Sequence, residues 1–274
     1  MTPDPLFDEL TQALDSRREA TWLLDELREV PPDARRGRAL ALARRRIDGE
    51  PLQYVLGHWP FRTLDLLVDS RVLIPRPETE PLVDLALAAV LAGHDGVVCD
   101  LGCGSGAIAL SVAVEARSRG AHLEVIATDV SSDALALAAH NAERNLAGPI
   151  VFLEGSWFDA LRAGDQGALT VLCANPPYVA AAERPTLARE LDFEPEIALV
   201  APDGTDGTPG FGAIETIIGK APTWLAPGGT LLVEHGAGHR SAVIACAERA
   251  GLVEVRDHDD LAGLPRILEA RRRR

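Results

Sequence analysis

Short apolar runs alternate with helical segments from residue 97 onward, and this alternation is the feature that most restricts the fold. The runs that read as strands are VVCDL, EVIATD, IVFLE, ALTVLCA, TLLVEHG, VEVR and RILEAR. Helices are expected from Gly106, from Ser132 and over 239–250. Buried strands separated by helices are typical of a mostly parallel sheet with right-handed crossovers. We therefore predict an α/β fold: a Rossmann-like, doubly wound, mostly parallel seven-stranded sheet, whose ligands bind at the carboxyl ends of the strands.

The beginning of the chain has a helical pattern instead. Apolar residues such as Leu6, Leu10 and Leu14 recur at four-residue spacing, and VPPD at 30–33 interrupts the run. An alternating segment, FRTLDLLVDSRVLIP, then suits a hairpin of two strands. We predict an N-terminal helical domain over 1–57, a hairpin linker over 58–80 and the α/β domain over 81–274.

The charge of the chain argues against a nucleic-acid-binding protein. There are 27 Lys and Arg against 41 Asp and Glu, a formal net charge of −14, whereas many phosphate contacts need a basic surplus. Basic clusters at 35–38, 44–46 and 271–274 are interpreted as solvated helix faces or tails, with a docking patch for an acidic partner as the alternative. We expect no stable nucleic-acid binding.

The cysteines and the apolar runs indicate a cytoplasmic protein. Cys99, Cys103, Cys173 and Cys246 form no C-x-x-C pair, so we expect reduced, buried thiols and no metal site. The acidic start lacks the apolar core of a signal peptide. The longest apolar run, LVDLALAAVLAG, is shorter than the ~20 residues that a membrane span needs.

A glycine-rich turn, DLGCGSGAIAL at 100–110, follows the first strand of the sheet. Its glycines permit a sharp turn and a close approach of the backbone to a ligand, and the following helix offers free N–H groups. The spacing is G-x-G-x-G and not the dinucleotide pattern G-x-G-x-x-G. With Asp100 just ahead, this favours a nucleoside without pyrophosphate, S-adenosylmethionine, over a purely structural turn. The expected cofactor contacts are Gly102, Cys103, Gly104, Ser105 and Gly106.

Two further cofactor contacts are expected at the next strand ends. Asp129 can accept both hydroxyls of a ribose, although a lone Asp here could also be a helix cap. Trp157 offers a flat surface for an adenine ring. The alternative for Trp157 is that it packs in the core, and this alternative is stronger for the neighbouring Phe158.

The segment NPPY at 175–178 ends the fourth strand and presents acceptors. Pro176 and Pro177 have no N–H, so the Asn175 side-chain oxygen and the Pro176 carbonyl remain to hold both hydrogens of an –NH₂ group. Tyr178 adds a ring face beside the substrate and the sulfonium. A simple turn is the alternative. We predict Asn175, Pro176 and Tyr178 as catalytic residues, Asn175 also as a cofactor contact, and all four residues as the substrate site.

The predicted chemistry is displacement of the S-adenosylmethionine methyl group by a planar nitrogen. Alignment in a dry site can supply much of the rate, so no dedicated base is required. His235 is a candidate base, with a structural role as the alternative. The nitrogen could belong to adenine in DNA, to an exocyclic amine in RNA or to a glutamine amide of a protein.

Five segments together resemble the release factor glutamine methyltransferases, the PrmC or HemK family. In order they are EPLQYVLG (50–57), LIPRPETE (73–80), DLGCGSGAIAL (100–110), NPPY (175–178) and DFEPEIAL (192–199). The resemblance covers about 50–274 nearly continuously. NPPY is shared with adenine methyltransferases, whereas PRPETE with EPLQYVLG is far more specific.

The resemblance implies a protein-(glutamine-N5) methyltransferase that modifies the Gly-Gly-Gln loop of class I peptide chain release factors and so modulates translation termination. S-adenosyl-L-homocysteine would be the product, and the N-terminal helices would bind the substrate. Residues 102–106 and Asp129 would contact the cofactor, Trp157 would lie near its adenine, and residues 175–178 would hold the glutamine. A monomer is expected.

Two departures from the family pattern concern segments outside the predicted site. The Gly- and Pro-rich loop at 201–212 is looser than expected, and Pro265 and Ile267 stand in the C-terminal segment where a charged residue and Val are more usual. Two rivals stay open: a nucleic-acid amino-methyltransferase, and a binding protein whose active site has decayed. Intact Asn175, Pro176 and Tyr178 argue against the second.

Overall fold

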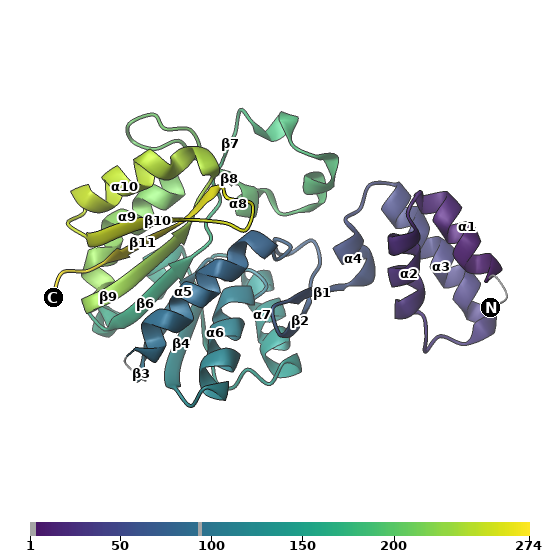
Figure 1. Ribbon diagram of the computed structural model, residues 1–274, viewed down its shortest axis with the longest axis horizontal. Helices are drawn as coiled ribbons and strands as arrows, with labels where there is room; N and C mark the ends of the chain where they lie inside the picture. Colours follow the sequence, from purple (N-terminus) through teal and green to yellow (C-terminus); the bar gives the residue numbers. More distant parts are fainter. Residues whose placement is uncertain (1–3, 93–94) are drawn as a thin grey trace.

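A seven-stranded sheet with helices on both faces forms the larger part of the protein (Figure 1). The computed structural model describes residues 4–92 and 95–274. Across the sheet the strands are β10 (Val253–Asp259), β11 (Pro265–Arg271), β9 (Leu225–Glu234), β6 (Leu169–Ala174), β3 (Asp95–Leu101), β4 (His122–Asp129) and β5 (Val151–Glu154). The strands from β9 to β5 are parallel, whereas β11 is antiparallel to both β9 and β10. The predicted fold is confirmed.

Two layers of helices cover the sheet because its strands are apolar on both faces. One layer is α5 (Glu80–Leu91), α6 (Ala107–Ser118) and α7 (Ser132–Arg144), and the other is α9 (Gly212–Trp224) and α10 (Arg240–Arg249). Successive strand residues point to opposite faces. In β3, for example, Val98 packs in the first layer, and Cys99 and Leu101 pack in the second.

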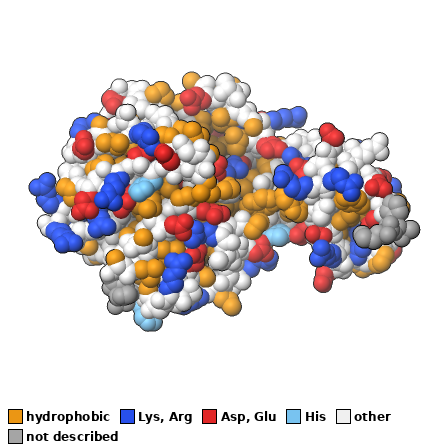
Figure 2. All heavy atoms as spheres, in the orientation of Figure 1, with side chains coloured by type: hydrophobic (Ala, Val, Ile, Leu, Met, Phe, Trp, Pro, Cys, Tyr) orange, Lys and Arg blue, Asp and Glu red, His pale blue; other side chains and the backbone are white. Residues whose placement is uncertain are grey.

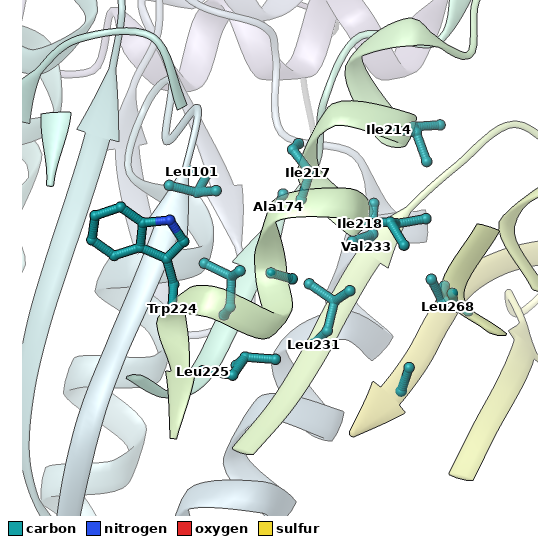
Figure 3. Close-up of a cluster of buried hydrophobic side chains, with 14 of the residues drawn as sticks. Leu101, Ala174, Ile214, Ile217, Ile218, Trp224, Leu225, Leu231, Val233 and Leu268 are labelled. Atoms are coloured by element: carbon teal, nitrogen blue, oxygen red, sulfur yellow. The ribbon is translucent and has the colours of Figure 1, made fainter. Parts of the chain in front are cut away.

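Figure 3 shows part of the second layer, where α9 lies over the middle of the sheet. Ile214, Ile217 and Ile218 of α9 share one buried cluster with Val233 of β9 and Leu268 of β11. All five are 0% exposed. Since burial of such a side chain stabilises by about 1.5–3 kcal/mol, this layer fixes α9 on the sheet.

The N-terminal region is helical, as predicted. Its elements are α1 (Pro5–Leu14), α2 (Arg17–Glu26), α3 (Pro32–Ile47) and α4 (Leu52–Leu56). They enclose a separate hydrophobic cluster that includes Leu10 and Leu23, and in Figure 1 they project to one side of the sheet. Caps help to define them, since Asp4 accepts from Leu6 N and Ser16 from Glu19 N. The domain boundaries stay a prediction.

The remaining elements are short. They are β1 (His58–Phe61), β2 (Leu64–Leu67), η1 (Pro77–Thr79), η2 (Trp157–Ala160), η3 (Ala163–Asp165), β7 (Val179–Ala180), η4 (Arg184–Thr186), η5 (Arg189–Phe193), α8 (Glu196–Leu199), β8 (Val200–Ala201) and η6 (Ala237–His239). A hairpin exists as the antiparallel strands β1 and β2, but it begins at His58 and ends at Leu67, earlier than the predicted segment 61–75. Within the described ranges, no helix is long and apolar enough to cross a membrane.

The arginines at 44–46 include two that make internal contacts. Arg45 forms hydrogen bonds of 2.6 and 2.8 Å with Glu50. Arg46 pairs with Glu19 of α2 at 2.9 Å and with Glu190 of η5 at 2.6 Å. Arg45 and Arg46 are therefore structural residues, and Arg46 links the N-terminal helices to the segment after β7.

The cysteines are buried and free, as the sequence predicted. Burial raises the pKa of the Cys99, Cys103 and Cys173 thiols well above the usual value. These thiols therefore stay protonated at neutral pH.

Candidate functional site

Two neighbouring cavities lie at the carboxyl edge of the sheet, where the sequence motifs converge. The first, of about 590 Å³, is lined by the glycine turn after β3, by Asp129 at the end of β4 and by Trp157 after β5. The second, of about 450 Å³, is lined by Pro176, Tyr178 and residues of η5. Both volumes are in the range of small-molecule sites. The residues common to both are Leu73, Ile74, Arg76, Asn175, Pro177 and Ala198.

The glycine turn brings bare backbone to the first cavity. The N–H groups of Gly102 and Cys103 both donate to Thr128 O of β4 at 2.8 Å, which fixes the turn. Gly104 has a φ of +53°, and a Cβ there would meet no atom within 4 Å. Since Gly104 lines the cavity, a ligand can lie directly against its backbone.

Residues 102–105 line the first cavity, but Gly106 does not. Gly106 is the N-cap of α6, with a φ of +84°, and a Cβ there would lie 3.0 Å from Leu110. This glycine therefore allows close packing at the start of the helix.

Asp129 is held at the first cavity by two backbone donors. Its Oδ2 accepts from Gly104 N and its Oδ1 from Ser131 N, each at 2.9 Å. The helix cap that was the alternative for Asp129 is supplied by Ser131, which accepts from Ala134 N at the start of α7. Asp129 thus joins the glycine turn to the end of β4.

Trp157 lies against the glycine turn, whereas Phe158 belongs to the core. A Cβ on Gly102 would lie 3.1 Å from the Trp157 ring, and Trp157 has an unusual φ of +48°. A left-handed backbone is costly for a bulky residue and is found where the structure requires a particular placement. Phe158 is buried and stacks on Trp224 with ring centroids 5.6 Å apart.

A buried carboxylate stands behind the glycine turn. Asp100 is 0% exposed, and its Oδ2 accepts from Ala109 N at 3.1 Å. Its Oδ1 has no partner among the described residues. Burial raises the pKa of Asp100 to about 7, and the nearby Asp129 adds to this shift. Asp100 lines neither cavity, whereas the bare turn, the Asp129 carboxylate and the Trp157 ring line the first cavity and together fit an adenosyl ligand.

The NPPY segment forms the wall between the two cavities. Asn175 and Pro177 line both, and Pro176 and Tyr178 line the second only. The Asn175 side chain donates from Nδ2 to Thr79 Oγ1 at 3.1 Å, so Oδ1 is the end of the amide that can accept from a ligand. Asn175 is therefore within reach of groups bound in either cavity.

Tyr178 packs beside a residue that the sequence analysis did not single out. Burial raises the pKa of its hydroxyl to about 12, so the ring stays neutral. Arg266 of β11 donates to Tyr178 Oη at 3.4 Å and to His235 O at 3.2 Å. Pro265 and Ile267 line neither cavity, but Arg266, which lies between them, contacts Tyr178.

His235 lies outside both cavities, and its neighbour Glu234 lines the second. His235 is 0% exposed, and its ring nitrogens lie 2.9 Å from Gly236 O and 2.7 Å from Asp257 Oδ2. Burial lowers its pKa. A side chain enclosed in this way has a structural role. Because side chains alternate between the two faces of a strand, the sequence could have indicated that only one of Glu234 and His235 faces the site.

The motifs that carried the family resemblance contact each other along the cavity wall. Glu194 of DFEPEIAL accepts from Ile74 N at 3.0 Å and pairs with Arg76, both of LIPRPETE. Tyr54 of EPLQYVLG donates to Val72 O at 2.5 Å. These contacts hold the segment 72–76 at the boundary of the two cavities.

The Gly- and Pro-rich loop at 201–212 packs against the NPPY wall, and Pro202 and Gly212 line the first cavity, so the expectation that this loop lies outside the site is wrong. Its backbone is linked by hydrogen bonds, among them Gly204 N to Thr208 O at 2.8 Å and Gly210 N to Asp203 Oδ1 at 3.0 Å. Gly210 has a φ of +64°, and a Cβ there would lie 2.4 Å from Tyr178 O. The glycine is required by this close approach.

Replacing Glu194 with alanine is expected to lower the free energy of unfolding by about 3 kcal/mol, because it leaves Arg76 and a buried N–H without their partner. Urea denaturation followed by circular dichroism measures the change. Glu196→Ala is the matched control, since Glu196 is exposed in the same segment, and its effect should stay within about 0.5 kcal/mol. Equal effects of the two changes would contradict the structural role of Glu194.

Comparisons with known proteins agree on one class of enzyme. Residues 83–200 match the family model described as the methyltransferase small domain. The release factor glutamine methyltransferase of Bordetella pertussis is 41% identical over 256 residues, which are 91% of this chain and 88% of that protein. The protein of the same description from Neisseria gonorrhoeae is 41% identical over 239 residues, 87% of this chain and 83% of that protein.

A solved structure resembles the chain in fold. A methyltransferase from Pyrococcus furiosus aligns with a TM-score of 0.52 at 15% identity, covering 88% of this chain and 100% of that chain. At this level of identity the likeness supports the fold alone.

Proposed function

The chain belongs to the release factor glutamine methyltransferases, and we propose that it methylates the side-chain amide nitrogen of the glutamine in the Gly-Gly-Gln loop of class I peptide chain release factors. The observation that carries the proposal is the shared wall of the two cavities, in which Asn175 can contact both a methyl donor and an acceptor amide. Methylation of this loop would modulate translation termination.

The first cavity is the proposed site of S-adenosylmethionine. When bound, this cofactor supplies an electrophilic methyl group on a sulfonium centre. Gly102, Cys103, Gly104 and Ser105 would lie along it, and Asp129 would accept from the ribose hydroxyls. Trp157 would lie near the adenine. Gly106 would act indirectly, through the packing of α6.

The NPPY segment orients the substrate amide. Asn175 Oδ1 and the Pro176 carbonyl accept the two hydrogens of the –NH₂ group, which leaves the nitrogen lone pair free to face the first cavity. The prolines add no competing donor. Tyr178 offers its ring face to the amide plane. Holding the reacting atoms in line can supply several kcal/mol of the barrier reduction.

The proposed reaction needs no dedicated base. An amide nitrogen loses its delocalisation as the new bond forms, and its proton then becomes acidic enough to pass to water. His235 is not assigned to this step, since it lies outside both cavities.

The N-terminal helices are the proposed docking site for the body of the release factor. They comprise the proposed domain 1–57, followed by the linker 58–80 and the catalytic domain 81–274. Arg44 is exposed on α3 and, unlike Arg45 and Arg46, has no ion pair among the described residues, so it is the residue of its cluster best placed for such contacts. A cytoplasmic monomer without a bound metal completes the proposal.

The charge distribution disfavours the alternative, a nucleic-acid amino-methyltransferase. The net charge is −14. On the face shown in Figure 2, Lys and Arg are scattered among Asp and Glu and do not form one basic stripe. Binding along a phosphate backbone requires such a stripe.

Transfer from tritiated S-adenosylmethionine tests the proposal. Label is expected on purified release factor, and none on a variant whose Gly-Gly-Gln loop carries Ala in place of Gln, nor on DNA or rRNA. Equal labelling of the loop variant would refute the glutamine assignment. Labelling of DNA or rRNA alone would favour the nucleic-acid alternative.

A further inference from the structure

A chain of hydrogen bonds runs from a buried carboxylate to Asn175 in the wall between the cavities. The Thr79 hydroxyl donates to Glu234 Oε2 at 2.6 Å, and Asn175 Nδ2 donates to Thr79 Oγ1 at 3.1 Å. Glu234 is 1% exposed and Thr79 is 4% exposed. The three residues come from the end of β9, from η1 and from the turn after β6, so only the folded chain brings them together.

The donors and acceptors of this chain determine the orientation of the Asn175 amide. A hydroxyl has one proton to donate, and an ionised carboxylate only accepts. Thr79 therefore gives its proton to Glu234 and can only accept from Asn175. The NH₂ end of Asn175 must then face Thr79, and Oδ1 must face away from it.

We propose that Glu234 and Thr79 are positioning residues that fix the Asn175 amide so that its oxygen faces the substrate nitrogen. The inference rests on the proposed function, because an oxygen is required only if the substrate presents an –NH₂ group. If the Asn175 amide were rotated by half a turn, its NH₂ group would face the NH₂ group of the substrate. Two donors cannot form a hydrogen bond with each other. The substrate would then be bound poorly or with its nitrogen out of line.

Protonation of Glu234 would remove this constraint on the orientation of the Asn175 amide. Its carboxyl faces Thr79 and Glu78 from η1, Asn175 and Tyr178 from the segment after β6, and Arg266 from β11. Burial raises the pKa of Glu234 to about 7 and Glu78 adds to this shift, against the opposing effects of Thr79, Arg266 and the Asn175 side chain. As the pH falls through this value the acid can donate to Thr79, and the Thr79 proton can then go to Asn175 Oδ1. The kcat should therefore fall on the acid side of about pH 7.

Thr79→Val tests the relay, because valine has nearly the shape of threonine without the hydroxyl. We expect kcat with release factor to fall roughly 100-fold, while the Kd for S-adenosylmethionine stays within about threefold. Thr79→Ser keeps the hydroxyl and should recover most of the rate. Thr230→Val is the matched control, since Thr230 is also buried, at 4% exposed, but lies in β9 away from both cavities.

Glu234→Gln tests the role of the carboxylate by a pH profile. Glutamine does not titrate, so the acid limb of kcat should be present in the wild type and absent in the variant. Wild-type kcat in Thr79→Val, or an unchanged acid limb in Glu234→Gln, would overturn the inference. If Thr79→Val does not fold, the pH profile of Glu234→Gln decides it. Failure of the wild type to label release factor would refute the proposed function itself, which is a distinguishable result.

Discussion

Replacing Asn175 with alanine is expected to lower kcat for release factor methylation by roughly 100-fold or more, because the change removes one of two acceptors that align the substrate amide. The affinity for S-adenosylmethionine should change little, since the glycine turn, Asp129 and Trp157 are untouched. Single-turnover kinetics with saturating release factor would measure the first effect. Isothermal titration calorimetry would measure the second.

Asn145→Ala is the matched control for this experiment. Asn145 is a half-buried asparagine at the end of α7 that donates to Asp65 O at 3.0 Å, outside both cavities. Its loss should lower stability and leave kcat near the wild-type value. If Asn175→Ala instead weakened cofactor binding as strongly as it lowered kcat, Asn175 would act mainly in the first cavity.

Motifs that are far apart in the sequence contact the NPPY wall between the two cavities or the segment next to it. Asn175 is oriented by Thr79 of LIPRPETE, and the neighbouring segment is held by Glu194 of DFEPEIAL. Gly210 of the long loop supports the same wall from behind. Thr79 and Gly210 thus lie against the NPPY segment itself, whereas Glu194 holds the segment beside it.

Much of the site could be predicted from local pattern. Strand ends converge in a parallel sheet, so the glycine turn, Asp129 and NPPY had to meet at one edge once the alternation of strands and helices was recognised. The unusual spacing of the glycines and the absence of N–H groups in the prolines are also visible in the sequence. These features depend on residue type and spacing alone.

The partners of these residues depend on tertiary contacts that no local pattern reveals. Glu234 and His235 are adjacent at a strand end, and which one faces the cavity depends on the register of β9. Arg266 reaches Tyr178 only because β11 is antiparallel to β9, which places Ile267 opposite Glu234. The pairing of Arg46 with Glu190 likewise joins two segments that are far apart in the chain.

A side chain at Gly104 is expected to abolish tight binding of S-adenosylmethionine. Gly104 and Gly120 form a matched pair, because both have positive φ, +53° and +80°, and a Cβ at either would meet no atom within 4 Å. Valine should therefore strain the backbone similarly at the two positions, by about 1–2 kcal/mol. The surroundings of the two positions differ. Gly104 faces the first cavity, whereas Gly120 faces solvent just after the C-terminal end of α6.

The Gly104→Val side chain would occupy the space in which the cofactor must approach the backbone, so its Kd should rise roughly 100-fold or more, the cost of about 2.7 kcal/mol. The Gly120→Val variant should bind the cofactor with a Kd within about twofold of the wild-type value, because its backbone strain is the same in the free and the bound protein. Calorimetric titration with S-adenosyl-L-homocysteine gives both values without turnover. Thermal unfolding checks that the two variants are destabilised alike. Equal cofactor affinity in the two variants would place the nucleoside elsewhere than along the glycine turn.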